Sequence, residues 1–265
     1  NEQKSAQWWL NIDYSLLDHI DVYEVEAGAN TPRMIARTGD KLPLASRPAQ
    51  TSTFAFPLQL SPEREYQYLV RVQTDGSVIV PMSIHSDTGY LVHLADQRLL
   101  IGIFHGGAFF LMLYNIGLLL VMRERLYLYY VLYVGSFLLI SINATGIGFE
   151  FFWRDHFWIQ SGAMPLFITS CCIFGLLFSR NLLDLKARSR TLFRFSNIIL
   201  GINLLAIPFC AFLPYSIGVR LAMANILFAI VYALVAGSHG GPGEGGEGGH
   251  HRGERGGMMM PPPPD

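Results

Sequence analysis

Cysteine is scarce in this 265-residue chain, and charge is scarce over much of its second half. The three cysteines are Cys171, Cys172 and Cys210, and residues 1–98 contain none. Disulfides therefore cannot hold the first region together, so it must rely on its own apolar core. The three thiols all fall in strongly apolar sequence, where they are expected to be packing residues rather than redox or metal sites.

Signatures of catalysis are missing as well. No glycine-rich phosphate loop follows a strand, no HExxH occurs, and no serine or cysteine has a placed histidine and acid partner. We therefore expect no enzyme activity in this chain, no cofactor and no nucleic-acid partner. The histidines His239, His250 and His251 lack rigid spacing and predict no metal site.

Long uncharged blocks occupy the sequence from Leu99 to Ala236. A bilayer core about 30 Å thick is crossed by about 20 apolar residues in a helix. Five blocks reach or approach that length, at residues 99–122, 126–149, 157–179, 195–218 and 221–236. The short polar loops cannot cover so many apolar helices in water. The pattern predicts an all-α bundle of transmembrane helices.

The cations between these blocks predict the orientation of the chain. The loops after the first and third blocks are basic, whereas the loop after the second has only Arg154 and the loop after the fourth only Arg220. Lys and Arg collect in cytoplasmic loops. The amino-terminal region is therefore expected outside the cell membrane. The residues that set this orientation are Arg123, Arg125, Arg180, Lys186, Arg188, Arg190 and Arg194.

Residues 1–98 show the alternation of β-strands. Apolar side chains recur at every second position in "FAFPLQL" (54–60), "YQYLVRV" (66–72) and "VIVPMSI" (78–84), and turn-rich segments separate these runs. An exported all-β sandwich is expected. Pro57 and Pro81 fall opposite the apolar rows and indicate edge strands or bulges.

A few polar and small residues inside the apolar blocks are candidate signalling or packing positions. His105 is the one ionisable group within a span, where it either senses pH or contacts a ligand, or else is structural. Asn115 and Asn143 are expected to hydrogen-bond between helices. Gly102 and Gly106 form a GxxxG pair that favours close packing within the chain, with homodimerisation as the alternative.

Several segments in order resemble one family. They are "WWLNIDYSLLDHIDVYEV", "RTGDKLPLASRP", "FAFPLQL" and "YLVRVQTDGSVIVPMSI", then Gly102, the Leu113-Tyr114-Asn115 triplet, Arg123 and the run from Tyr127 to Tyr130. Together they resemble the bacterial seven-transmembrane receptors with diverse intracellular signalling modules. The resemblance implies a carbohydrate-binding, jelly-roll-like sensory domain on a multi-pass protein of the bacterial inner membrane.

Large aromatic side chains are what a sugar-binding sandwich would use, because a pyranose ring presents an apolar face to them. The candidates for ligand binding are Trp8, Trp9, Tyr23 and Tyr90, together with Arg47 in a segment that matches the family. Core or edge packing is the alternative role for these residues.

The sequence also departs from that family. The sensory domain is expected to lack its first strands, five spans stand where the family has seven, and no diguanylate cyclase or histidine kinase follows. A fragment is therefore expected. The tail at 237–265, rich in Gly, Pro and Glu, predicts disorder and suggests a shift of reading frame near Ala236.

These observations predict a sensor with three domains, at 1–98, 99–236 and 237–265. It would bind a small molecule or carbohydrate outside the membrane and signal through the helix bundle. The expected partners are the lipid bilayer, the ligand and a second copy of the chain. The alternative is a transporter or channel subunit with an exported cap domain.

Overall fold

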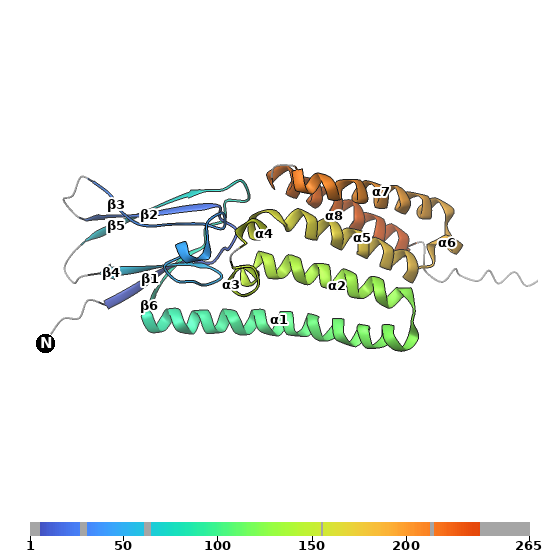
Figure 1. The fold of residues 1–265 in the computed structure, drawn as a ribbon, viewed down its shortest axis with the longest axis horizontal. Coiled ribbons are helices and arrows are strands. Elements are labelled where there is room, and N and C mark those ends of the chain that lie inside the picture. The colour runs from blue at the N-terminus through green and yellow to red at the C-terminus, as the bar shows by residue number, and fades with distance from the viewer. Residues whose placement is uncertain (1–5, 27–30, 61–64, 155, 213–214, 239–265) are drawn as a thin grey trace, which may run out of the picture.

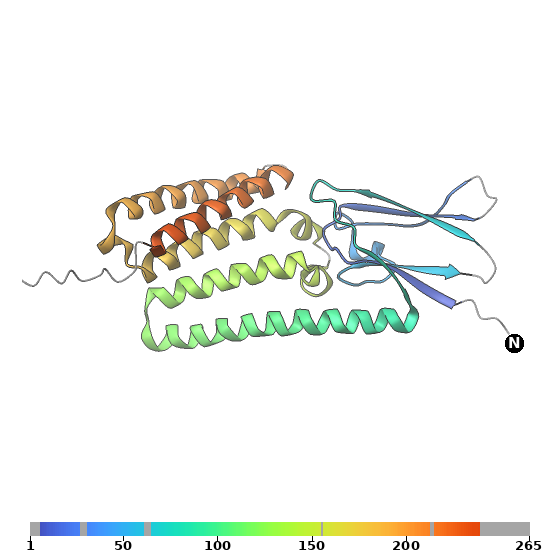
Figure 2. The same ribbon diagram turned by 180° about the vertical axis from the view of Figure 1, so that it is seen from behind.

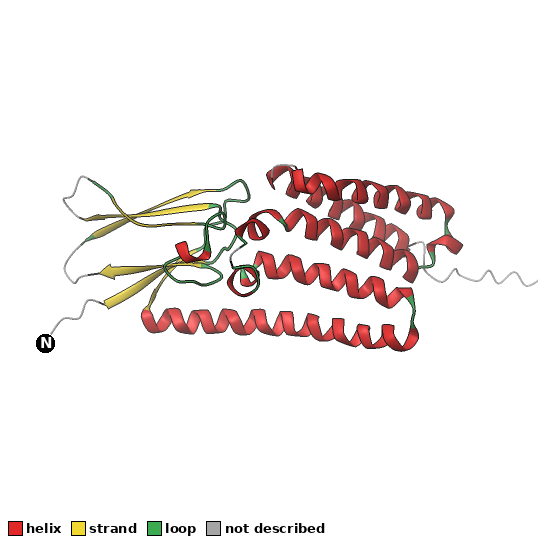
Figure 3. Cartoon of the chain, in the orientation of Figure 1, coloured by secondary structure: helices red, strands yellow, loops and turns green. Residues whose placement is uncertain are grey.

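The structure is a computed structural model that describes residues 6–26, 31–60, 65–154, 156–212 and 215–238. Its strands lie at one end of an elongated molecule, and its long helices run side by side away from them (Figures 1 and 3). The strands are β1 (Ala6–Ile12), β2 (His19–Glu26), β3 (Arg33–Thr38), β4 (Phe54–Leu60), β5 (Tyr66–Gln73) and β6 (Met82–Ser86). The helices are α1 (Asp87–Met122), α2 (Arg125–Ala144), α3 (Ile147–Phe151), α4 (Phe157–Gly162), α5 (Met164–Leu182), α6 (Leu185–Arg188), α7 (Arg190–Phe212) and α8 (Tyr215–Ser238).

The described strands form two antiparallel sheets of three strands, in the orders β4-β1-β6 and β3-β2-β5. Between the sheets lies an apolar core that includes Ile12, Ile20, Val22, Phe54 and Phe56. The alternation expected over 54–60 and 66–72 is confirmed, and β4 with its Pro57 is an edge strand of the described sheet. The all-β sandwich followed by helices is thus the observed fold.

The third expected strand differs from the prediction. Strand β6 begins only at Met82, and Val78 is 71% exposed rather than buried. Ile84 pairs with the core residue Leu10 yet stays 60% exposed. The reason is that β6 is an edge strand of the described sheet, and the apolar core that buries β1 does not extend over it. The alternation of polarity over 78–84 therefore did not report burial.

The helix ends also differ from the expected ones. α1 begins at Asp87, twelve positions before Leu99, and α2 stops at Ala144 before a glycine with positive φ, Gly146. The third block is split into α4 and α5, and Pro165 stands in the first turn of α5. Proline is tolerated there because a first-turn N–H has no helical partner in any case.

The last two blocks divide earlier than expected. α7 ends at Phe212 and α8 already begins at Tyr215, whereas the division was expected at 219–220. The sequence between these two helices contains Pro214, and a proline disfavours a helix interior. Within the described residues, four helices are long and apolar enough to cross a membrane, and the apolar stretch Ile217–Leu227 of α8 is shorter. The tail at 239–265 lies outside the described residues.

The helix surfaces have the composition that lipid contact requires. On α1, Leu100 is 68% exposed and Val121 80% exposed. Helix α5 packs against α2, α7 and α8, and α1 packs against α2. The turn between α1 and α2 and the short α6 lie at the end of the molecule far from the strands (Figures 1 and 2). Arg123 is in that turn, and Lys186 and Arg188 are in α6, whereas Arg180 is in the last turn of α5, and Arg190 and Arg194 are in the first turns of α7. This arrangement agrees with an amino-terminal domain on the side opposite the basic loops.

Candidate functional site

The sandwich passes into the helices without a linker. Strand β6 ends at Ser86, whose Oγ caps α1 by accepting a hydrogen bond from the Gly89 N–H at 3.2 Å. α1 has 36 residues and a length of about 54 Å at 1.5 Å per residue, which exceeds a bilayer core of about 30 Å. Its first turns therefore extend beside the sandwich. β6 and α1 are therefore continuous in the backbone, with no residue between them.

These first turns dock on the outer face of the sheet β4-β1-β6. The rings of Trp9 and Tyr90 stack with centroids 4.9 Å apart. The Trp9 Nε1–H donates to Asp87 Oδ1 at 2.9 Å. The structure thus brings together two of the residues expected to hold a sugar, but they face each other. In this arrangement their ring faces attach α1 to the sheet.

A polar cluster continues this contact along α1. Asp13, which follows β1, accepts a hydrogen bond from Gln97 Nε2 at 2.7 Å and contacts His93 Nε2 at 3.1 Å. The His93 ring stacks on His85 of β6 with centroids 4.6 Å apart. Strands β1 and β6 are therefore both in contact with α1 through side chains.

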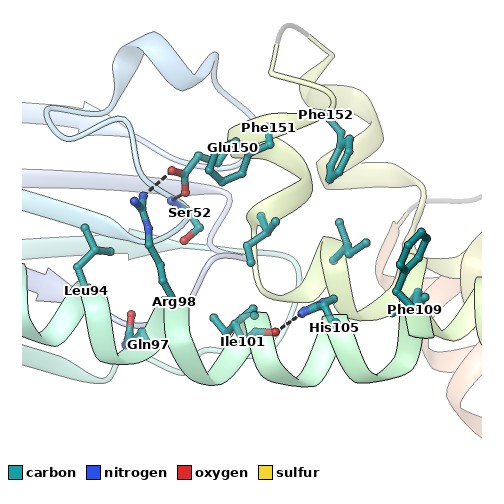
Figure 4. A pocket seen from close by; sticks show the side chains of 15 residues that line it. Ser52, Leu94, Gln97, Arg98, Ile101, His105, Phe109, Glu150, Phe151 and Phe152 are labelled. Carbon is teal, nitrogen blue, oxygen red and sulfur yellow. Dashed lines mark hydrogen bonds and ion pairs between the residues drawn. The ribbon is translucent and has the colours of Figure 1, made fainter. Parts of the chain in front are cut away.

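Glu150 of α3 is the centre of the junction between sandwich and helices (Figure 4). One carboxylate oxygen accepts a hydrogen bond from the backbone N–H of Ser52 at 2.9 Å. The other accepts from Arg98 Nη2 of α1 at 2.6 Å. The Glu150 side chain is 7% exposed. A single buried charge thus joins a sandwich loop, the long helix α1 and the short helix α3, and charged hydrogen bonds of this kind are the stronger ones.

Arg47 supports the loop that presents Ser52. It is 2% exposed, and its Nη1 donates to the carbonyls of Thr51 at 2.6 Å and Ser52 at 2.9 Å. Its guanidinium lies 4.2 Å from the centroid of the Phe54 ring and 5.1 Å from that of Phe149 in α3. Burial lowers the pKa of Arg47 to about 10. The expected ligand-binding arginine is therefore an interior residue that connects the sandwich to α3.

The two parts also approach each other closely at Gly146. Its φ is +74°, and a Cβ atom there would lie 2.5 Å from the Ser52 carbonyl oxygen and 2.7 Å from Ser15 Oγ. The Ser15 hydroxyl donates to the Thr145 carbonyl at 3.0 Å. Only glycine meets both the backbone conformation and the spacing. The sandwich loops therefore sit directly on the turn between α2 and α3.

A second buried acid lies close to this junction, in the sandwich. Asp40 is 3% exposed, and burial together with the neighbouring Asp18 carboxylate raises its pKa to about 7. Lys41 pairs with Asp18 at 2.7 Å. Arg47 acts in the opposite direction and favours the charged form of Asp40. Asp40 consequently changes its charge near neutral pH.

A cavity of about 520 Å³ opens beside Glu150, between α1, α2 and α3 (Figure 4). His105 lines it, with Nδ1 bonded to the Ile101 carbonyl at 2.8 Å and a buried Nε2 that has no partner among the described residues. Gly102 and Gly106 also line it, and a Cβ at either would meet nothing within 4 Å. This corrects the expectation of close helix packing within the chain at these glycines. Homodimerisation through them stays a prediction.

The two asparagines behave differently. Asn115 donates to the Leu111 carbonyl of its own helix, and the described residues show no interhelical bond of the kind expected for it. Asn143 is fully buried and exchanges hydrogen bonds with Gln160 of α4, as expected. A reciprocal pair between α7 and α8, Asn203 with Asn225, supplies a further polar contact inside the bundle.

The remaining two candidates for ligand binding lie on different sheets. Trp8 shares the core side of β1 and packs against the core. Tyr23 of β2 is on the outer face of the sheet β3-β2-β5, since its neighbour Val22 is in the core. It pairs across the strands with Met34 and Leu69, each 45% exposed. The five candidates therefore do not form one site, and Tyr23 alone stands on an open sheet face.

Sequence reasoning missed the junction residues Ser52, Arg98 and Glu150. A signal for two of them was present, because Arg98 precedes the first apolar block and Glu150 follows the second. Antiparallel neighbouring helices place such ends at the same depth. Nothing in the sequence pointed to the backbone N–H of Ser52.

Comparison with protein families gives two matches. The family described as 7TM diverse intracellular signalling matches residues 97–239, which is more than half of the chain. The family described as 7TMR-DISM extracellular 2 matches residues 1–86. No curated protein and no solved structure matches the chain. Both matching families are sensory and signalling domains, and neither is an enzyme family.

Proposed function

The chain belongs to the family of seven-transmembrane receptors with diverse intracellular signalling, and we propose that its sandwich binds a carbohydrate and signals through the Glu150 junction. It is thus a membrane sensory receptor with its amino-terminal domain outside. This membership favours the sensor hypothesis over the transporter or channel subunit. We place it in the inner membrane of a bacterium, as a multi-pass protein that acts on a cytoplasmic signalling module.

The observation that carries the proposal is the direct continuation of β6 into α1, reinforced at Glu150. The connection from β3 to β4 carries Ser52, so a ligand that moves either sheet changes the position of Ser52 against Glu150. A movement that reaches the sheet β4-β1-β6 also moves α1 through the backbone itself. A ligand shifts the population of two helix arrangements only by its difference in affinity for them. A change from mostly one state to mostly the other needs a difference of about 5.5 kcal/mol.

The outer face of the sheet β3-β2-β5 is the best candidate for the ligand surface. Tyr23 and the exposed Met34 and Leu69 give it an apolar centre. Two positions away on the same face, Asp21 accepts a hydrogen bond from Arg37 Nε at 2.8 Å and lies 3.6 Å from Arg71 Nη1. The buried Asp21 carboxylate holds two exposed guanidinium groups beside the aromatic ring. The ring and the guanidinium groups offer both contacts that a sugar needs, an apolar face and hydrogen-bonding groups for its hydroxyls.

Binding is tested with the whole chain in phosphatidylcholine nanodiscs on a panel of immobilised neutral and acidic oligosaccharides. We expect Tyr23→Ala and Asp21→Asn each to weaken binding about tenfold, which corresponds to about 1.4 kcal/mol. Tyr66→Ala, an aromatic deletion on the same sheet but on its core side, is the matched control. If no oligosaccharide binds, the carbohydrate hypothesis is wrong.

Transmission is tested on the same samples by hydrogen exchange. A bound oligosaccharide is expected to change amide exchange in residues 87–98 and 145–152, which lie on the helix side of the junction. Binding that leaves both segments unchanged would show that the sandwich is a passive binding module.

A further inference from the structure

The cavity beside Glu150 has one polar end and one apolar end. Arg98, Gly102, His105 and Phe109 recur at intervals of three or four on α1, so they share one helix face. Figure 4 shows Arg98 at the end next to the sandwich and Phe109 at the other end. These two residues are separated by about 16 Å along the helix axis. The cavity therefore runs from the outer membrane surface into the apolar region.

The glycines of α1 create the space in this cavity. Gly102 and Gly106 are one turn apart, both line the cavity, and a side chain at either would enter open volume. Leu138 and Ile142 of α2 form the opposite wall together with Phe151 and Phe152. A slot with apolar walls beside a lipid-facing helix suits a flexible hydrocarbon chain, and its volume of about 520 Å³ is in the range of small-molecule sites.

The polar end favours a negative charge. Arg98 uses one Nη2–H on Glu150, and its side chain is 47% exposed, so most of its N–H groups have no partner among the described residues. Arg47 is buried nearby but does not line the cavity, and both Glu150 and Asp40 oppose its charge. The free guanidinium N–H groups at this end are therefore those of Arg98. Guanidinium groups bind carboxylates and phosphates with two parallel hydrogen bonds. Deeper in the cavity, His105 Nε2 is a buried polar atom without a partner in the described part of the chain.

We propose that this cavity binds a single-chain amphiphile with an anionic head, such as a long-chain fatty acid, taken from the outer leaflet. The head lies at Arg98, and the hydrocarbon chain passes Gly102, His105 and Gly106 toward Phe109. Because Arg98 also holds Glu150, an occupied cavity competes for the junction and adds a membrane-derived signal to that of the sandwich. The binding site itself is independent of the carbohydrate proposal.

The test uses the whole chain in phosphatidylcholine nanodiscs with a palmitate that carries a photoactivatable diazirine near its methyl end. Mass spectrometry of the labelled protein is expected to find the label on residues 101–109 of α1 and on 138–152. The variants Gly102→Leu and Gly106→Leu each fill the cavity from one side. Excluding two methylene groups of the chain lowers affinity by about tenfold, and labelling should fall accordingly.

Gly107→Leu is the matched control. Gly107 is on the same helix and equally free of neighbours, but it does not line the cavity. Labelling that is equal in the Gly102→Leu, Gly106→Leu and Gly107→Leu variants would overturn the site and indicate contact with bulk lipid only. Competition distinguishes the head group: unlabelled palmitate should compete and hexadecanol should compete about tenfold less well. Equal competition by both would overturn the anionic head.

Discussion

Glutamine in place of Glu150 is the sharpest test of the junction. The variant keeps the shape of the side chain but removes its charge, and it offers one carbonyl oxygen where the carboxylate offered two. In the native protein, the Ser52 N–H and Arg98 Nη2 donate to the two different oxygens of Glu150, at 2.9 and 2.6 Å. With one acceptor, one donor faces an amide N–H₂ instead. The sandwich loop and α1 therefore compete for the same atom.

The expected cost follows from the two contacts. A hydrogen bond to a charged group contributes about 1.5–3 kcal/mol, against about 0.5–1.5 for a neutral one, so the Ser52 contact loses about 1 kcal/mol. Arg98 is half exposed, and solvent screening limits its ion pair to about 1 kcal/mol or less. The total is about 2 kcal/mol, which raises the population of the opened junction about thirtyfold.

The assay is hydrogen exchange of the whole chain in nanodiscs, resolved to the Ser52 amide. Exchange at Ser52 is expected to accelerate about thirtyfold in Glu150→Gln, because this N–H exchanges when the junction opens. The matched control is Glu24→Gln in β2. Glu24 also holds an arginine and a hydroxyl, from Arg33 at 2.6 Å and Tyr68 at 3.1 Å, but its contacts lie within the sandwich.

A folded Glu150→Gln protein with unchanged exchange at Ser52 would refute the reasoning. So would an equal acceleration in Glu24→Gln, because the effect would then be a general loosening of the sandwich.

Three further predictions concern stability and are checked by thermal unfolding of the whole chain in nanodiscs. Gly146→Ala should lower the unfolding temperature, because the αL backbone costs a residue with a Cβ about 1–2 kcal/mol before the contact at 2.5 Å is counted. Gly107→Ala should leave the unfolding temperature unchanged. Equal shifts in the two variants would count against the close approach at Gly146. The free energy of unfolding should fall by up to about 4 kcal/mol as pH rises from about 4 to 7, because Asp40 has a raised pKa of about 7 in the folded state and must ionise while buried. Asp40→Asn should remove this dependence of stability on pH. An unaltered dependence would assign it to another group. Asn203→Leu or Asn225→Leu alone should cost about 0.6–1.7 kcal/mol and the double variant less than their sum, with strict additivity arguing against the pair.

Much of the fold could be predicted because the relevant signals are local. Alternation over 54–60 and 66–72 marked two strands correctly, since burial on one face of a sheet has a period of two. The same reasoning failed over 78–84, where an edge strand leaves Met82 and Ile84 uncovered. The predicted helix ends were also wrong. Polar residues such as 87–98 continue a helix when they pack against a neighbouring surface, so the helix extends beyond its apolar block.

The candidate site was less predictable. Trp9 and Tyr90 were two of the five candidates for ligand binding, yet only the packing of α1 on the sheet shows that their rings stack on each other. Arg47 is a residue type that often contacts ligands, but in this fold it lies in the interior. Residue type gives the chemistry that a side chain can perform, but its surroundings decide whether it meets a ligand.

The sequence by itself determined that an alternating, cysteine-free region precedes long apolar helices, and that basic loops lie opposite the amino-terminal domain. These properties depend on neighbours a few positions away. Only the tertiary structure decided that Ser52, Arg98 and Glu150 meet, although 98 and 52 positions separate Glu150 from its two partners. It also decided that two glycines of α1 open a cavity instead of joining helices. Such contacts depend on how sheets and helices pack in three dimensions, and no short stretch of sequence records that geometry.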